Sequence, residues 1–196
     1  MPNWGRRCLI LTPFPAFLEQ ARNFKEQGNE YFRGNRHREA LNFYTQGLNV
    51  QPNDTSIREA LLLNRAACNL KLSKYSFIWA RGSESLRVSS PENYGSVLRD
   101  TSEALLLNPK ATKGYFRASA ALVELERYNE ALDVCDRCLA FDPSDASVRQ
   151  QREKVLALKD TWDRKEMEKA DRARKEIAEK RVMNAAFNVS RLGMDG

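Results

Sequence analysis

The sequence predicts an all-α fold: an α-solenoid of three antiparallel helix pairs followed by one long capping helix. Two segments of 34 residues repeat one pattern, and a related segment lies between them. A stretch of 44 residues towards the C-terminus contains neither glycine nor proline, as expected of a single helix. With 196 residues, 42% of them hydrophobic, the chain can bury one core or one solenoid of ordinary size.

The repeated segments occupy residues 21–54 and 112–145. They share an aromatic residue at position 4, a small residue at position 8, alanine at position 20 and proline at position 32. The matching residues are Phe24 and Tyr115, Gly28 and Ser119, Ala40 and Ala131, and Pro52 and Pro143. This pattern is typical of tetratricopeptide repeats, in which small residues let two antiparallel helices cross closely. Consensus aromatics are predicted to pack within the repeats: Phe24, Tyr31, Tyr44, Tyr115 and Tyr128.

A third repeat is predicted at 59–111, with helices at 59–75 and 94–111. It has the standard length only if 19 residues, 75–93, are treated as an insertion at the tip between its helices. Three interpretations remain open: a regulatory or partner-binding loop acting through Phe77, Ile78 and Trp79, an ordinary surface insertion, or a short intron translated by mistake.

The remaining segments flank the repeats. Residues 1–20 are predicted to form an N-terminal extension, 146–187 a long charged capping helix that Ser144 or Asp145 begins, and 188–196 a tail. We expect four apolar residues of the long helix to cover the open end of the last repeat, since a solenoid needs a cap. They are Val148, Val155, Leu158 and Trp162. From Asp163 to Arg181 the two charge signs alternate, which favours a solvated helix.

Composition limits the classes of function. The net charge of +6 favours anionic partners, but the sequence lacks the dense basic tracts of nucleic-acid binders. No apolar run is long enough to cross a membrane. A signal peptide is not expected, because Pro13 and Pro15 interrupt the only apolar N-terminal stretch. We therefore expect a cytoplasmic location, or a nuclear one as well, with reduced cysteines. Cys135 and Cys138 have no further ligands for a closed zinc site, so neither a metal nor a cofactor is predicted.

Five polar residues are predicted to face the inner side of the solenoid, which the first helix of each repeat lines. They are Lys25, Asn29, Asn64, Lys113 and Arg117, and none is an acid. Lys113 and Arg117 lie four residues apart on one helix face without a carboxylate at that spacing. An external anion is the missing partner in this interpretation, and a C-terminal aspartate would offer two neighbouring carboxylates to fixed Lys, Arg and Asn donors.

The motifs "KEQGN", "NRAA" and "KGYFR" together resemble the carboxylate clamp of tetratricopeptide co-chaperones. The chain is most similar to the tetratricopeptide repeat protein 4 family, whose fungal members are called cyclophilin-seven suppressor. This resemblance covers about residues 21–185 and implies that the five inner residues bind the C-terminal Glu-Glu-Val-Asp of heat-shock protein 90, heat-shock protein 70 or both. It also implies a further C-terminal domain, so we expect this chain to be a C-terminally truncated member.

The predicted function is that of a non-catalytic, monomeric co-chaperone adaptor that binds neither nucleic acid nor membrane. No nucleophile, base and orienting group occur together in the sequence, so the chain is not expected to be an enzyme. Two alternatives stay open. The repeats could be the targeting half of a phosphatase or prolyl isomerase whose catalytic domain is missing, or a scaffold for another acidic C-terminus.

Overall fold

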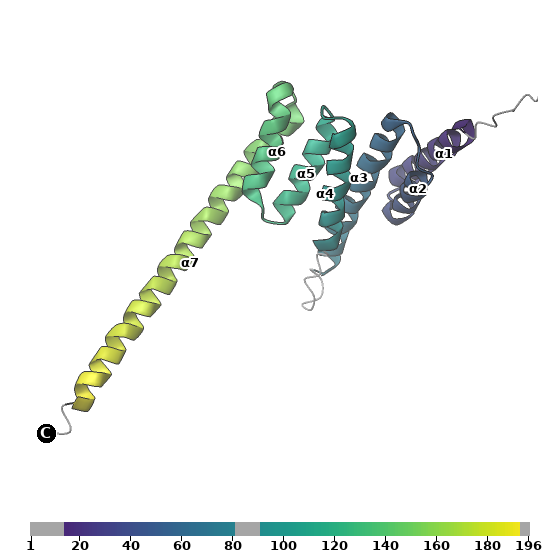
Figure 1. The fold of residues 1–196 in the computed structure, drawn as a ribbon. Helices are drawn as coiled ribbons and strands as arrows, with labels where there is room; N and C mark the ends of the chain where they lie inside the picture. The colour runs from purple at the N-terminus through teal and green to yellow at the C-terminus, as the bar shows by residue number, and fades with distance from the viewer. Residues whose placement is uncertain (1–13, 81–90, 193–196) are drawn as a thin grey trace, which may run out of the picture. The chain divides into compact units, whose positions relative to one another are not determined.

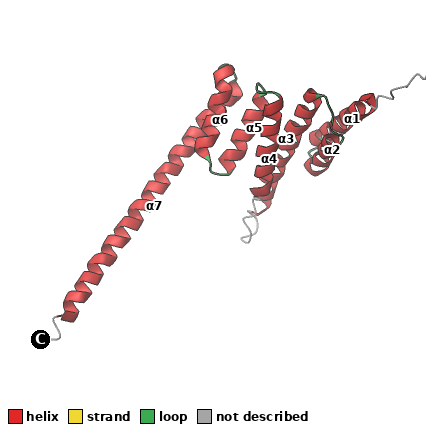
Figure 2. Cartoon of the chain, viewed as in Figure 1, coloured by secondary structure: helices red, strands yellow, loops and turns green. Residues whose placement is uncertain are grey.

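The computed structural model describes residues 14–80 and 91–192. These residues form seven α-helices and no β-strand (Figure 1, Figure 2). The helices are α1 (Phe14–Arg33), α2 (His37–Asn49), α3 (Thr55–Ala80), α4 (Pro91–Leu107), α5 (Thr112–Glu124), α6 (Tyr128–Phe141) and α7 (Ala146–Leu192). The predicted all-α solenoid is confirmed. Over the described residues, no helix is long and apolar enough to span a membrane.

The chain divides into two compact units, residues 1–152 and residues 153–196. In the first unit α1 packs against α2, α3 against α4, and α5 against α6, and each pair also packs against the next pair (Figure 1). α3 in addition contacts both α1 and α5, whereas α2, α4 and α6 do not contact one another within the described residues. The first helices of the pairs therefore form the closer, inner layer of the solenoid.

The first and last helix pairs turn in the same way. Asn35 and Glu126 each follow the first helix with a positive φ, 57° and 58°. The backbone N–H groups of Arg36 and Arg127 then donate, at 2.9 Å, to the carbonyl oxygen five residues earlier. Such a bond satisfies carbonyl groups that the helix end would leave without a partner. The 34-residue repeat of the sequence is thus also a repeat of backbone geometry.

The middle pair extends beyond the helices predicted for it. α3 begins at Thr55, because the Asp54 carboxylate accepts hydrogen bonds from the N–H groups of Ser56 and Ile57, and it continues to Ala80. α4 runs from Pro91 to Leu107. Residues 75–80 and 91–93 of the predicted insertion are therefore helical, and its centre lies outside the described residues, as do the side chains of residues 77–79.

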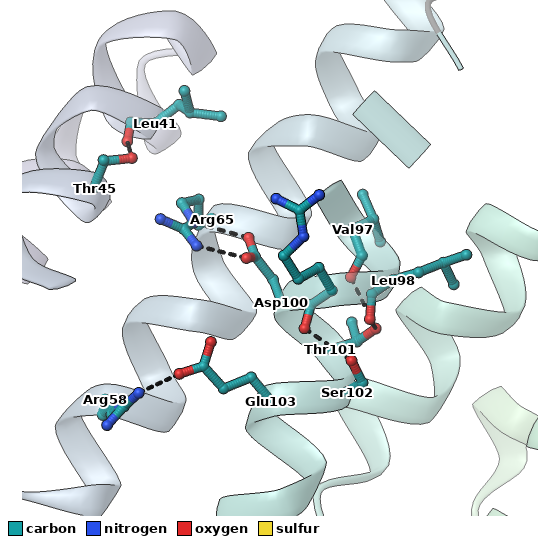
Figure 3. A network of polar contacts seen from close by, with 11 residues as sticks. Leu41, Thr45, Arg58, Arg65, Val97, Leu98, Asp100, Thr101, Ser102 and Glu103 are labelled. Atoms are coloured by element: carbon teal, nitrogen blue, oxygen red, sulfur yellow. Dashed lines mark hydrogen bonds and ion pairs between the residues drawn. The ribbon is translucent and has the colours of Figure 1, made fainter. Parts of the chain in front are cut away.

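The two helices of the middle pair are joined by buried contacts. Tyr94 and Val97 of α4 lie in one buried cluster with Ala66 of α3. Asp100, whose side chain is 3% exposed, accepts two hydrogen bonds from Arg65, at 2.8 and 2.6 Å (Figure 3). One turn after Asp100 on α4, Glu103 pairs with Arg58 of α3 in a more exposed position (Figure 3). The predicted insertion therefore does not prevent the closure of this helix pair.

α1 begins earlier than the predicted start of the first repeat at residue 21. Its first residue is Phe14, so the segment 14–20, predicted to belong to an extension, is helical. Pro15 fits there because the first turn of a helix needs no N–H donor. Leu18 explains the extra turns, since it packs against the buried cluster that contains Ala21 and Tyr44.

α7 crosses from the first unit into the second. In the first unit Asp145 caps the helix by accepting a hydrogen bond from the N–H of Val148, at 3.0 Å. Val148 packs against Cys135 and Cys138, and all three side chains are buried. The other three residues predicted to cap the solenoid belong to the second unit, and their capping role stays a prediction.

In the second unit, the surface of α7 is almost entirely exposed from residue 164 to residue 184. Lysine and arginine side chains pair along it with carboxylates three or four residues away, as in Lys159 with Asp163 and Lys169 with Glu166. Pairs of this kind support a solvated helix, although each contributes little.

The middle pair leads to a prediction about stability. Changing Asp100 to Asn removes the carboxylate that accepts both hydrogen bonds from the half-buried Arg65 guanidinium, and should lower the free energy of unfolding by about 2–3 kcal/mol. Changing Glu103 to Gln, its matched control on the exposed pair, should cost less than about 1 kcal/mol. Urea unfolding followed by circular dichroism would measure both. Equal losses of unfolding free energy in the two variants would show that the Arg65–Asp100 ion pair does not stabilise the packing of α3 on α4.

Candidate anion-binding site

The inner layer holds all five of the predicted site residues. Lys25 and Asn29 lie one turn apart on α1, Asn64 lies on α3, and Lys113 and Arg117 lie one turn apart on α5. α3 packs against both α1 and α5, so Asn64 lies between the residue pair on α1 and the residue pair on α5. Lys113 is exposed, and the other four side chains are partly buried.

The two asparagines contact each other directly. The Nδ2 group of Asn64 donates to Oδ1 of Asn29 at 3.0 Å. The same oxygen accepts a second hydrogen bond, at 2.8 Å, from the hydroxyl of Tyr44 on α2. Both lone-pair directions of the Asn29 amide oxygen are thereby used within the protein, and its NH₂ group remains as a donor.

Arg117 presents a buried donor without an acceptor. Its Nη1 atom is buried and has no hydrogen-bond partner within the described residues. Burial lowers the pKa of Arg117, but a guanidinium keeps its charge in proteins. Cys68 and Tyr44 are the ionisable groups that interact electrostatically with it. Burial raises the pKa of each to about 12, so both are neutral near pH 7 and leave the arginine charge uncompensated.

A cavity of about 570 Å³ adjoins the two cations of α5. Lys113 and Arg117 line it together with Phe116, which is 38% exposed, and with Leu70 and Lys71 of α3. The cavity thus joins positive charge to apolar surface. Asp145 also lines it, but that carboxylate already accepts the capping hydrogen bond of α7.

The structure links some of the predicted residues more closely than others. Asn29 and Asn64 are hydrogen-bonded, and Lys113 and Arg117 share a cavity wall. Lys25 has neither of these contacts and lies one turn before Asn29 on α1. Within the described part of the chain, no carboxylate forms an ion pair with any of the three cations.

The structure gives Tyr44 a second role that the sequence did not predict. Tyr44 was predicted only to pack, and its side chain is indeed 1% exposed, but its hydroxyl also contacts Asn29. The signal that could have indicated this contact is Gly28, immediately before Asn29. A Cβ atom at Gly28 would lie 2.5 Å from Cε1 of Tyr44, so only glycine lets the ring come this close.

Comparison with known proteins identifies homologues of this chain. No family model matches the chain. The Hsp70/Hsp90 co-chaperone cns1 of Schizosaccharomyces pombe is 32% identical over 167 residues, which are 85% of this chain and 40% of the relative. The chain is homologous to the Hsp70/Hsp90 co-chaperone Cns1 and to tetratricopeptide repeat protein 4. Human tetratricopeptide repeat protein 4 is 29% identical over 72% of the chain and 32% of its own length. The resemblance seen in the sequence motifs is thereby confirmed.

Solved structures show the same similarity. The Hsp90 co-chaperone Cns1 from Saccharomyces cerevisiae matches with a TM-score of 0.71 and 30% identity over 87% of this chain and 49% of the other. The first tetratricopeptide domain of Spaghetti (RPAP3), solved bound to the Hsp90 peptide SRMEEVD, matches with a TM-score of 0.56 and 25% identity, over 71% of this chain and 93% of that domain.

The chain spans about two fifths or less of the length of these Cns1 and tetratricopeptide repeat protein 4 relatives. They are named as co-chaperones or repeat proteins and not as catalytic enzymes, in agreement with the prediction that this chain is not an enzyme.

The state of Cys68 beside Arg117 is testable. With a pKa of about 12, only about 10⁻⁴ of this thiol is ionised at pH 8, so iodoacetamide should leave Cys68 of the native chain almost unmodified. The same chain unfolded in guanidinium chloride serves as the control and should react fully. Mass spectrometry of tryptic peptides measures both. Rapid labelling of the native chain would show an accessible thiolate that could neutralise Arg117.

Proposed function

We propose that this chain binds the C-terminal Glu-Glu-Val-Asp of heat-shock protein 90, heat-shock protein 70 or both through a carboxylate clamp in its three repeats. The clamp consists of Lys25, Asn29, Asn64, Lys113 and Arg117. In this proposal the chain acts as the chaperone-binding part of a non-catalytic co-chaperone in the cytoplasm or nucleus.

The observation that supports the proposal best is the buried Nη1 group of Arg117. A buried donor without an acceptor costs about 1–3 kcal/mol, and more when the group is charged. No acidic side chain of the described residues pays this cost through an ion pair, and the neighbouring Cys68 and Tyr44 are neutral. A carboxylate ligand would supply the acceptor and the counter-charge together.

The other groups extend the same argument. The free NH₂ group of Asn29 and the ammonium of Lys113 are further donors for an anion. A C-terminal aspartate carries two carboxylates, and each hydrogen bond to a charged group contributes about 1.5–3 kcal/mol. Ordering a flexible peptide offsets much of the sum, which leaves an expected dissociation constant of about 1 μM.

The cavity beside α5 fits the residues that precede the aspartate. Phe116 and Leu70 offer apolar surface to the valine, and Lys71 offers a positive charge to a glutamate. The peptide of the Spaghetti (RPAP3) structure, SRMEEVD, has these chemical types in this order.

The test is calorimetric titration with a peptide ending in Met-Glu-Glu-Val-Asp and with the same peptide amidated at its C-terminus. The free acid should bind with a dissociation constant of about 1 μM, more weakly at higher salt, and the amide at least about tenfold more weakly. Lys113→Glu should abolish binding, because it places a carboxylate where the ligand's own carboxylate lies.

Lys110→Glu is the matched control. It makes the same change in net charge on an exposed residue that does not line the cavity. Its affinity should stay close to that of the original chain. Failure of the free-acid peptide to bind a folded chain, or equal effects of the two variants, would contradict the proposal.

A further inference from the structure

The hydroxyl of Tyr44 connects the outer layer of the solenoid to the proposed clamp. Tyr44 belongs to α2, whereas the clamp residues lie on α1, α3 and α5. Its hydroxyl donates to Oδ1 of Asn29 at 2.8 Å, and Asn64 donates to the same oxygen at 3.0 Å. The side chain is 1% exposed, so the hydroxyl cannot itself form the surface that a peptide touches.

The close approach of Tyr44 depends on Gly28. A Cβ atom at position 28 would lie 2.5 Å from Cε1, 2.7 Å from Cδ1 and 2.9 Å from Cζ of the ring. Any larger residue would push the ring away from α1, and the hydroxyl with it. Because Gly28 directly precedes Asn29, the absence of one side chain brings the tyrosine hydroxyl within reach of the next residue.

The orientation of the Asn29 amide decides what the site offers to a ligand. The amide can rotate by half a turn and exchange its oxygen for its NH₂ group at nearly the same positions. With the oxygen turned to the peptide it would repel a carboxylate, and with NH₂ turned to the peptide it donates a hydrogen bond. Two donors on the oxygen hold the amide in the second orientation.

A phenol hydroxyl serves this purpose only while it keeps its proton. Burial, as the largest cause, raises the pKa of Tyr44 to about 12. The hydroxyl therefore remains a donor throughout the physiological pH range. Arg117 interacts electrostatically with the same hydroxyl, so Tyr44 is linked to Asn29 by a hydrogen bond and to Arg117 by charge.

We propose that Tyr44 is a positioning residue for anion binding: its hydroxyl, brought in by Gly28, fixes the Asn29 amide so that the NH₂ group faces the ligand carboxylate. This inference rests on the proposed function, because it concerns the binding of a peptide carboxylate. It differs from the packing role of Tyr44 in that it assigns the effect to one oxygen atom and not to the ring.

Tyr44→Phe tests this assignment because it keeps the ring and removes the hydroxyl. In calorimetry with the Met-Glu-Glu-Val-Asp peptide, affinity should fall about tenfold, the equivalent of one hydrogen bond to a charged ligand. The weak binding of the amidated peptide should change much less. Tyr31→Phe is the matched control, since Tyr31 stacks on Phe43 at 4.9 Å between ring centroids and makes no hydrogen bond to Asn29.

A double-mutant cycle separates positioning from a loss of packing. If Tyr44 acts through Asn29, Tyr44→Phe should have almost no further effect on affinity in a chain that already carries Asn29→Ala. Additive losses in the cycle, or unchanged affinity of Tyr44→Phe, would overturn the inference. A second variant, Gly28→Ala, should also weaken binding by displacing the ring, and its melting temperature would report whether the chain still folds.

The ligand-free chain gives a readout that does not depend on binding. The side-chain NH₂ resonances of Asn29 in a ¹H–¹⁵N spectrum should shift or broaden in Tyr44→Phe and stay in place in Tyr31→Phe. If the original chain fails to bind the peptide, the proposed function fails. These resonances then still decide whether Tyr44 orients the amide, and unchanged resonances overturn that as well.

Discussion

Every part of the solenoid depends on one constraint: a pair of short amphipathic helices cannot bury its apolar side alone. Leu61 of α3 completes the buried cluster of the first pair, and Ala111, just before α5, joins the cluster of Leu62 and Leu63 on α3. Each helix pair thus contributes buried side chains to the core of the neighbouring pair. This stacking, more than helix propensity, places α1, α3 and α5 beside one another and makes an inner face from residues far apart in sequence.

The inner face departs from ordinary packing in a way that suits a ligand. A folded chain normally gives every buried donor an acceptor, yet Nη1 of Arg117 has none within the described residues. The amide of Asn29, by contrast, is satisfied at its oxygen by two donors, while its NH₂ group remains as a donor. An anion that binds Arg117 would remove the cost of its unsatisfied buried donor. The Asn29 amide already has a fixed orientation, so its binding costs less conformational entropy.

The middle pair shows how the site stays in register despite the long segment between its helices. Asn64 of the proposed clamp directly precedes Arg65 on α3. Arg65 donates two hydrogen bonds to the carboxylate of Asp100 on α4. Tyr94 and Val97 of α4 share a buried cluster with Ala66, the residue after Arg65. Arg65 thus ties α3 to α4 (Figure 3), while the neighbouring Asn64 donates to Asn29 of α1. The length of the connection between the two helices then adds only a slowly growing entropic cost.

The sequence by itself determined the solenoid and the spacing of its repeats, because a 34-residue period repeats both side-chain chemistry and turn geometry. It also predicted the five polar residues of the proposed clamp. It placed helix ends less well: Leu18 adds turns before residue 21, and Asp54 begins α3 earlier than the apolar pattern does. Only the tertiary structure decided which polar groups meet. The contact of Tyr44 with Asn29 joins two helices through space left by Gly28, and the buried Nη1 of Arg117 has no acceptor among the described residues. Periodicity fixes the direction in which a residue faces along its own helix, whereas a hydrogen bond between helices depends on distances of a few tenths of an ångström that packing alone sets.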